Sequence, residues 1–247
     1  MKKKILFVGA SFAQVPPIKY AKKMGYYVVA CDQNKKSPGF KYCDESYIIS
    51  TTNKKKIYEL SKKLKINGII TYVSDTASPA VSYVAKKLNL KGLPIKAVNT
   101  LVYKNLFRKF LKKNNFNYPE FKIFRSKEKI NNFIDKIGYP FFIKPIDSSG
   151  SKGVTKVVKK IFIKKAISEA LNYSKKKKFI IERIIERKGY QIAGDGFVMN
   201  KKLVFRCWGD EHFNEKLNGL ITIGPSLPSV HQEKKFKIVH QETQRII

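Results

Sequence analysis

A lysine at position 144 lies in an otherwise apolar stretch, Phe-Phe-Ile-Lys-Pro, that is typical of a buried strand. An isolated charge in such a strand is costly unless it has an anionic partner. Three residues later a segment rich in small residues begins, from Asp147 to Gly153. Small residues let the backbone approach a ligand closely, and their N–H groups can surround phosphate oxygens. The order of lysine, small-residue loop and strand therefore indicates phosphate binding, although the loop alone would equally suit a flexible hairpin turn.

Two further groups of residues suit a nucleotide. Glu182 ends a predicted strand, and the Arg-Ile-Ile segment after it can offer backbone groups to an adenine edge, while the carboxylate can bind a ribose. Lys104 and Arg108 are four residues apart and so share one face of a predicted helix. Each feature alone is more typical of an ordinary strand end or of a solvated helix face.

The first hundred residues alternate between strand and helix patterns. Strands are predicted at residues 4–8, 26–31, 46–49 and 68–73, and helices at residues 15–24, 54–64 and 77–88. This alternation indicates a parallel sheet with right-handed crossovers. In such sheets ligands bind beyond the carboxyl ends of the strands. Residues 9–14, 32–34 and 74–76 are therefore expected to form a binding edge.

Near residue 95 the pattern changes, and the second half reads as α+β with antiparallel character. Asn200 and Lys201 separate the last two predicted strands like a tight hairpin turn. Helices are predicted at residues 103–114, 127–137 and 163–173, and strands at residues 121–124, 139–145, 154–158, 179–182, 190–199 and 202–208.

Taken in order, these pieces resemble the ATP-grasp family, in the branch of carbamoyl-phosphate synthetase and biotin carboxylase. The matching motifs are Lys104-xxx-Arg108, Tyr-Pro-Phe-Phe-Ile-Lys144-Pro, Asp-Ser-Ser-Gly-Ser-Lys-Gly153-Val and Ile-Ile-Glu182-Arg-Ile-Ile. The first half resembles the pre-ATP-grasp domain of that family at Gly9-Ala-Ser, Pro-Gly-Phe-Lys-Tyr-Cys-Asp44 and Ser74-Asp-Thr-Ala77.

The resemblance extends over essentially the whole chain and predicts an α/β fold with two domains. It implies a Rossmann-like parallel-sheet pre-ATP-grasp domain at residues 1–102 and an incomplete α+β ATP-grasp domain at residues 103–247. The family converts a carboxylate and ATP into an acyl phosphate, which an amine or similar nucleophile then attacks. The chain is thus expected to belong to a carboxylate–amine ligase that uses ATP and Mg²⁺ with small-molecule substrates.

The resemblance also implies roles for individual residues. Lys104 and Lys144 are expected to contact the ATP phosphates, and the small-residue loop to close over them. Glu182 and Ile185 are expected to frame the ribose and adenine. The expected nucleotide-binding set is Lys104, Lys144, Ser148, Ser149, Gly150, Ser151, Lys152, Gly153, Glu182, Arg183, Ile184 and Ile185.

Substrate and metal sites are less well defined by the sequence. From their place after a predicted strand, Ser74, Asp75 and Thr76 are expected to face the substrate, and Arg206 is expected to be a catalytic residue that anchors a carboxylate. Local capping or surface charge would explain these four residues equally well. The Mg²⁺ ligands of the family lie on late strands, so we expect no metal ligand in this chain and place the ligands beyond residue 247.

Composition limits the remaining function classes. The formal net charge is +33, from 51 Lys and Arg against 18 Asp and Glu, but the lysines are spread along the chain, which favours a solvated surface over a specific nucleic-acid site. Cys31, Cys43 and Cys207 form no CxxC pair, which favours free thiols in a reducing cytoplasm. No apolar run approaches the roughly 20 residues that cross a bilayer.

Three alternatives stay open. A nicotinamide-binding Rossmann protein would place Asp32 on a ribose, but its fingerprint positions read Gly9, Ser11 and Gln14. A catalytically inactive ATP-binding fragment or a regulatory protein, from a truncated or split gene, is the second alternative. A basic nucleic-acid binder is the third. The sequence also leaves open a homodimer and the identity of the acid and the amine.

Overall fold

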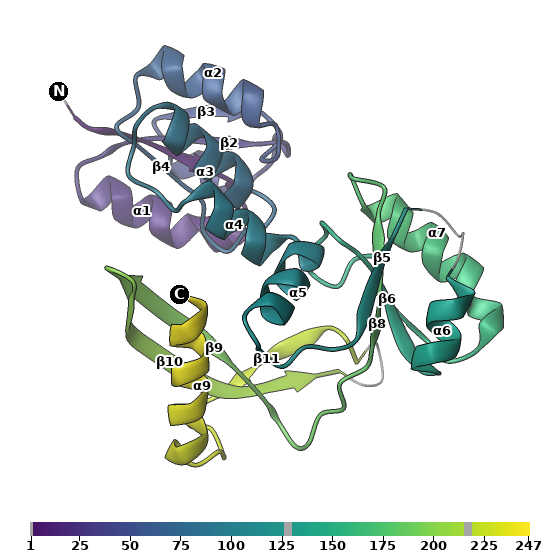
Figure 1. Cartoon of the computed structure of the whole chain (residues 1–247). Coiled ribbons are helices and arrows are strands. Elements are labelled where there is room, and N and C mark those ends of the chain that lie inside the picture. Colours follow the sequence, from purple (N-terminus) through teal and green to yellow (C-terminus); the bar gives the residue numbers. More distant parts are fainter. Residues whose placement is uncertain (1, 126–129, 215–218) are drawn as a thin grey trace. The chain divides into compact units, whose positions relative to one another are not determined.

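The structure is a computed structural model that describes residues 2–125, 130–214 and 219–247. Its contacts divide the chain into two units, Met1–Arg183 and Ile184–Ile247 (Figure 1). The first unit contains a parallel and an antiparallel sheet, and the second contains an antiparallel sheet with one long helix. The domain boundary predicted at residue 102 falls inside the first unit, between its two sheets, and stays a prediction.

The N-terminal part of the first unit is a parallel sheet in the order β3-β2-β1-β4, as the alternating pattern predicted. Its strands are β1 (Lys4–Val8), β2 (Tyr27–Asp32), β3 (Glu45–Ile48) and β4 (Gly68–Ile70). β4 is shorter than the predicted strand, and Val73, which was expected to continue it, has a left-handed φ of 49°.

Helices cover both faces of this sheet. α1 (Val15–Lys23) packs on one face, where Ile18 meets Phe7. α2 (Lys54–Leu64) and α3 (Ser78–Lys87) pack on the other face, against Leu6 and Val8. The alternation of side chains along β1 thus supplies two cores, one for each face.

Two helices connect the sheets of the first unit. α4 (Ile95–Val102) was not predicted, and α5 (Lys104–Lys113) agrees with the helix predicted at residues 103–114. Three short 3₁₀ helices, Phe12–Gln14, Pro38–Tyr42 and Lys160–Phe162, were not predicted either.

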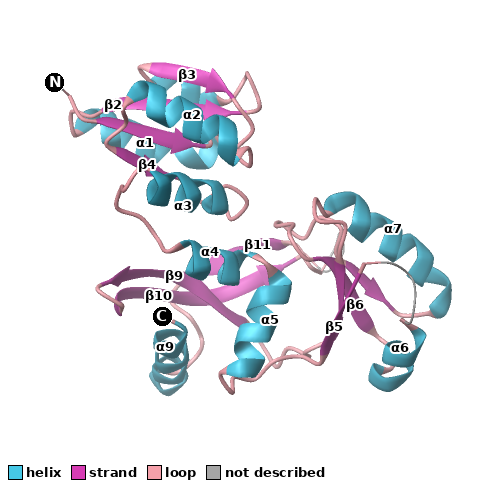
Figure 2. Cartoon of the chain, turned by 45° about the horizontal axis from the view of Figure 1, so that its top comes forward, coloured by secondary structure: helices cyan, strands magenta, loops and turns pink. Residues whose placement is uncertain are grey.

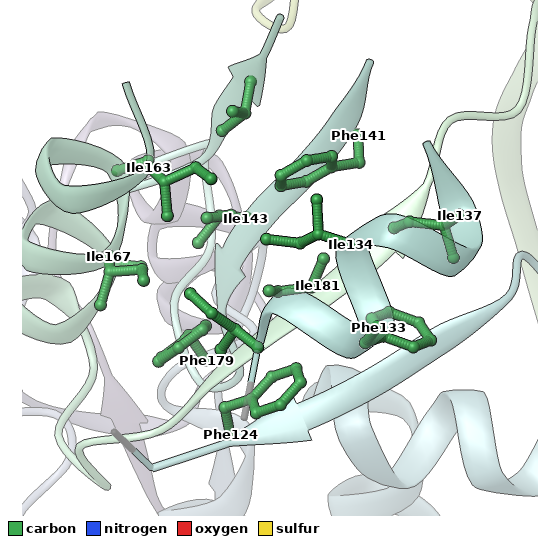
Figure 3. Packing of buried hydrophobic residues seen from close by; sticks show 14 residues of the cluster. Phe124, Phe133, Ile134, Ile137, Phe141, Ile143, Ile163, Ile167, Phe179 and Ile181 are labelled. Atoms are coloured by element: carbon green, nitrogen blue, oxygen red, sulfur yellow. The ribbon is translucent and has the colours of Figure 1, made fainter. Parts of the chain in front are cut away.

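The antiparallel sheet of the first unit has the order β5-β8-β6-β7. Its strands are β5 (Phe121–Phe124), β6 (Phe141–Pro145), β7 (Thr155–Val157) and β8 (Phe179–Arg183). α6 (Asn131–Ile137) and α7 (Ile163–Tyr173) pack on one face, where Phe141, Ile143 and Phe179 are fully buried (Figure 3). Residues 127–129 of the helix predicted at residues 127–137 lie outside the described residues.

The second unit is built around a long hairpin. β9 (Gln191–Met199) and β10 (Lys202–Phe213) pair antiparallel, and Asn200 and Lys201 turn the chain with φ of 51° and 63°. The predicted hairpin is therefore confirmed, but β10 is longer than predicted, because its end pairs with both β9 and β11 (Thr222–Ser226). α9 (Glu233–Ile246) packs on β10 (Figure 2).

No helix among the described residues is both long enough and apolar enough to cross a bilayer.

Candidate functional site

Lys144 and Glu182 lie on the face of the antiparallel sheet that α6 and α7 leave uncovered. Along β6 the buried residues Phe141 and Ile143 point into the core, so Lys144 points to the opposite side. Glu182 of β8 is directly opposite Phe142 and therefore shares this side with Lys144. Only 2% of Glu182 is exposed, and its carboxylate forms an ion pair with the ammonium of Lys144.

α5 adds two further cations to this face. Arg108 Nε donates to Glu182 Oε2 at 3.0 Å. One turn earlier, the ammonium of Lys104 donates to the carbonyl of Ser148, and the backbone N–H of Lys104 donates to the carbonyl of Ile146 at 3.0 Å. The helical spacing predicted for Lys104 and Arg108 thus brings both residues to the same site. We call Lys104, Arg108 and Lys144 the cation cluster.

The cation cluster has one buried carboxylate to neutralise it. Burial alone would raise the pKa of Glu182, but the charges of Lys144 and Arg108 outweigh burial and hold this pKa below its usual value. Burial, and then the nearby charge of Lys144, lower the pKa of Lys104. The Asp147 carboxylate also acts on Lys104, so three cations face two carboxylates. The remaining positive charge lies in a poorly solvated place, which favours a bound anion.

The small-residue loop begins directly after the strand that carries Lys144. Its backbone enters the left-handed region at Gly150, Ser151 and Gly153, with φ of 62°, 55° and 72°. Ser148 Oγ donates to the carbonyl of Lys152 at 3.0 Å, which closes the turn. The loop therefore starts at the cation cluster, through the contact of Lys104 with the Ser148 carbonyl.

The predicted substrate residues lie beyond the carboxyl end of β4. Ser74 accepts hydrogen bonds through its carbonyl from the N–H of Ala77 at 3.2 Å and from Ser78 Oγ at 3.1 Å, which starts α3. Asp75 is exposed and Thr76 is half-buried. Local capping therefore explains part of this segment, and its role toward a substrate stays a prediction.

Asp32, the residue that a nicotinamide-binding protein would place on a ribose, stabilises turns instead. Its Oδ2 accepts the N–H of Ala10 and its Oδ1 accepts the N–H of Asn34, each at 2.9 Å. Gln14 Oε1 accepts from the N–H of Ser11 at 2.9 Å and fills the space beside Gly9. This turn is closed by its own side chains, which disfavours the nicotinamide alternative.

Arg183 ends the first unit, where its guanidinium donates to Glu120 Oε2 at 3.3 Å, and the other remaining predicted residues belong to the second unit. Ile184 is half-buried and Ile185 is exposed, immediately after β8. The guanidinium of Arg206 donates to the carbonyl of Phe236 and to Glu233 Oε1, each at 2.8 Å, and so holds α9 on β10. A role of Arg206 in anchoring a substrate carboxylate stays a prediction.

The contacts of two other residues, Arg108 and Asp147, were not predicted from the sequence. Arg108 was noted only for its spacing from Lys104, and its bond to Glu182 follows from the packing of α5 on the sheet. Asp147 was read as the first residue of the loop, whereas its carboxylate bonds the segment after α7. Across the described ranges, no three His, Cys, Asp or Glu side chains lie close enough to hold a metal ion.

A family model and several curated proteins match the chain. The family model described as D-ala D-ala ligase C-terminus matches residues 110–203. A formate-dependent phosphoribosylglycinamide formyltransferase of Prochlorococcus marinus (strain MIT 9515) is 25% identical over 182 residues, which cover 72% of this chain and 46% of the relative. The enzyme of the same name from Methanocella arvoryzae is 24% identical over 184 residues, covering 74% and 43%. The chain spans about half the length of the curated relatives it matches.

Solved structures share the fold over the whole chain. N5-carboxyaminoimidazole synthetase from Staphylococcus aureus, complexed with ADP, superposes with a TM-score of 0.78 at 17% identity, covering 100% of this chain and 64% of that one. The biotin carboxylase domain of 2-oxoglutarate carboxylase from Hydrogenobacter thermophilus, in complex with MgADP, ADP and bicarbonate, gives 0.75 at 18% identity, with coverage of 100% and 58%. The predicted fold class is confirmed by these similarities.

Proposed function

We propose that the chain is a member of the ATP-grasp superfamily and that it supplies the ATP-binding part of a carboxylate–amine ligase. The observation that carries the proposal is the cation cluster around Glu182, at the start of a small-residue loop. The negative charge of a triphosphate would neutralise the excess positive charge of that site. The ADP complexes of two structural neighbours support a nucleotide as the anion.

We assign the phosphate contacts to Lys104 and Lys144. Lys104 bonds the Ser148 carbonyl and Lys144 bonds Glu182, so both ammonium groups have protein oxygens that a phosphate can replace or share. The N–H groups of residues 148–153 then cover the phosphates. Glu182 is proposed to accept from a ribose hydroxyl, and the backbone of residues 183–185 to bind the adenine edge.

The proposed reaction has two steps. A substrate carboxylate oxygen attacks the γ-phosphorus of ATP, which forms an acyl phosphate and releases ADP. An amine or similar nucleophile then attacks the acyl carbon and releases phosphate. Lys104 and Lys144 promote the first step because they stabilise negative charge on the transferred phosphoryl group and on the leaving ADP.

Magnesium enters the proposal only as the usual partner of ATP in this superfamily, where it spreads the phosphate charge. The described part of the chain brings together no acidic cluster suited to Mg²⁺, so we derive no step through the ion. An ATP-binding protein without turnover stays a second candidate.

For the substrates other than ATP, we propose candidate binding residues without naming the acid or the amine. Ser74, Asp75 and Thr76 are proposed to face a small carboxylate or amine substrate, because they follow a strand at the carboxyl edge of the parallel sheet. Arg206 is retained as the candidate anchor for a carboxylate. The three cysteines are free thiols, which agrees with a reducing cytoplasm as the site of action. A homodimer stays a prediction.

Comparison of three nucleotides tests the proposal. In equilibrium titrations at one ionic strength, ATP should bind about tenfold to a hundredfold more tightly than AMP, because only ATP brings the β- and γ-phosphates to the cation cluster. Saturable binding of NADH together with no detectable binding of ATP would instead restore the nicotinamide alternative.

A further inference from the structure

The carboxylate of Asp147 bonds the segment that follows α7. Asp147 Oδ1 accepts from Ser174 Oγ at 2.6 Å, and Asp147 Oδ2 accepts from the backbone N–H of Lys176 at 2.9 Å. Hydrogen bonds to an ionised acceptor are roughly twice as strong as those between neutral groups. Both oxygens of Asp147 are thus used to attach the start of the small-residue loop to the connection between α7 and β8.

Ser174 is buried, with 1% exposure, and its hydroxyl is used twice. It donates to Asp147 and accepts the backbone N–H of Lys178 at 3.1 Å. The carbonyl of Lys178 in turn accepts the N–H of Ile146 at 3.4 Å. The strand end at residues 146–147 and the connection at residues 174–178 are therefore joined by several hydrogen bonds, one of which involves the buried hydroxyl of Ser174.

The other end of the loop reaches the same place. Gly153 is buried, and a Cβ added to it would lie 2.9 Å from the Cβ of Tyr173, the last residue of α7. Both ends of the loop therefore contact consecutive residues, Tyr173 and Ser174. The hydrogen bonds within the loop span few residues: Lys152 N–H donates to the Ser149 carbonyl at 3.5 Å, and Ser148 Oγ donates to the Lys152 carbonyl at 3.0 Å.

We infer that Asp147 and Ser174 are positioning residues, which fix the small-residue loop on the end of α7 so that its N–H groups face the nucleotide phosphates. The inference rests on the proposed function and adds residues that act through the loop. Both oxygens of Asp147 accept hydrogen bonds from the α7–β8 connection, and its charge also acts on Lys104. The Asp147 carboxylate is therefore engaged in holding the start of the loop.

Four variants separate positioning from charge. Asp147→Ala and Ser174→Ala each remove the contact, while Asp147→Asn preserves its shape: the amide oxygen can accept from Lys176 and the amide nitrogen can donate to Ser174. Asp135→Ala is the matched control, since Asp135 is an exposed acid on α6, which packs on the other face of the same sheet. Each variant is titrated with ATP, and hydrogen exchange of residues 148–153 is measured with and without saturating ATP.

We expect Asp147→Ala and Ser174→Ala to bind ATP about tenfold more weakly than the wild type, and to lose most of the ATP-induced protection of residues 148–153. Asp147→Asn should retain most of the ATP affinity and most of the ATP-induced protection, and Asp135→Ala should behave as the wild type. If Asp147→Ala does not fold, Ser174→Ala and Asp147→Asn decide alone, since each removes no more than one polar group.

Two results would overturn the inference in distinguishable ways. If the wild type binds ATP, and Asp147→Ala and Ser174→Ala match Asp135→Ala in affinity and protection, the positioning role is wrong while the proposed function stands. If the wild type itself binds no ATP, the proposed function fails and the inference fails with it.

Discussion

Glu182 sets the charge balance of the site at the scale of single residues. It is the buried anion that both Lys144 and Arg108 contact. Removing one partner of a buried ion pair is destabilising, because the other charge then lacks compensation. When Lys144 is removed, Glu182 still has its ion pair with Arg108. A Lys144 variant should therefore lose affinity for ATP without losing its fold.

The lowered pKa of Lys104 predicts how ATP binding responds to pH. Burial and then the charge of Lys144 favour the neutral amine, so Lys104 loses its proton at a lower pH than an ordinary lysine. ATP affinity should therefore fall as the pH rises toward the ordinary lysine value of about 10.4. Lys104→Arg keeps its charge throughout this range and should show a flatter profile.

The measurement is the ATP dissociation constant of both proteins across this alkaline range, at constant ionic strength. Parallel profiles for the wild type and Lys104→Arg would show that Lys104 does not contribute its charge to nucleotide binding.

The sequence predicted the need of Lys144 for an anionic partner but not which group meets it. The apolar residues around Lys144 were enough to predict a buried strand. Its pairing with Glu182 depends on the antiparallel register of β6 and β8, which places Phe142 opposite Glu182. Such a register is fixed by the packing of two strands that are distant in the sequence, so no local pattern contains it.

At the scale of elements, the helices and strands that the sequence did not predict are those whose formation depends on tertiary packing. α4 contains the β-branched residues Ile95, Val98 and Thr100, which are weak helix formers, and it packs between α3 and α5. β11 contains Gly224 and Pro225, which read as a loop; an edge strand tolerates proline, and β11 is at the edge. By contrast, α2 and α7 follow clear apolar periods and were predicted with their observed bounds.

Two glycines of the small-residue loop should respond differently to alanine. Both have positive φ, but a Cβ at Gly150 meets open space, whereas a Cβ at Gly153 meets the Cβ of Tyr173. Gly150→Ala should cost only the backbone strain, about 1 kcal/mol of unfolding free energy. Gly153→Ala should cost about 1–3 kcal/mol more, because the Cβ of Tyr173 cannot move without shifting α7.

Urea unfolding of the two variants and the wild type measures this difference. Equal losses for Gly150→Ala and Gly153→Ala would mean that the loop does not rest on α7.

At the scale of the whole molecule, the fold is shared with ATP-grasp structures over the full chain, and the chain spans about half the length of its curated relatives. The alternating pattern of the first half was enough to predict the parallel sheet. The division of the contacts after Arg183 was not predicted, because it depends on how the hairpin of β9 and β10 packs within its own unit.

The net charge of +33 predicts weak, nonspecific binding of duplex DNA at low salt. Because the lysines are spread along the chain, this binding should be lost by about 0.15–0.2 M salt, as counterion release predicts for phosphate contacts. ATP binding at the cation cluster should persist there, since partly buried charges are screened less. A salt series with labelled DNA and with ATP checks both, and DNA binding that survived 0.2 M salt would favour a specific nucleic-acid site.

The ATP affinity of Lys144→Ala, compared with that of Lys165→Ala, tests the central claim most directly. Lys165 is an exposed lysine on α7, which packs on the other face of the same sheet, so both variants remove one charge. Thermal unfolding of each variant confirms that it is folded at the temperature of the titration. Lys144→Ala should bind ATP about a hundredfold more weakly than the wild type, while Lys165→Ala should bind it normally. Equal affinity of Lys144→Ala and Lys165→Ala would contradict the assignment of this face to the phosphates of ATP.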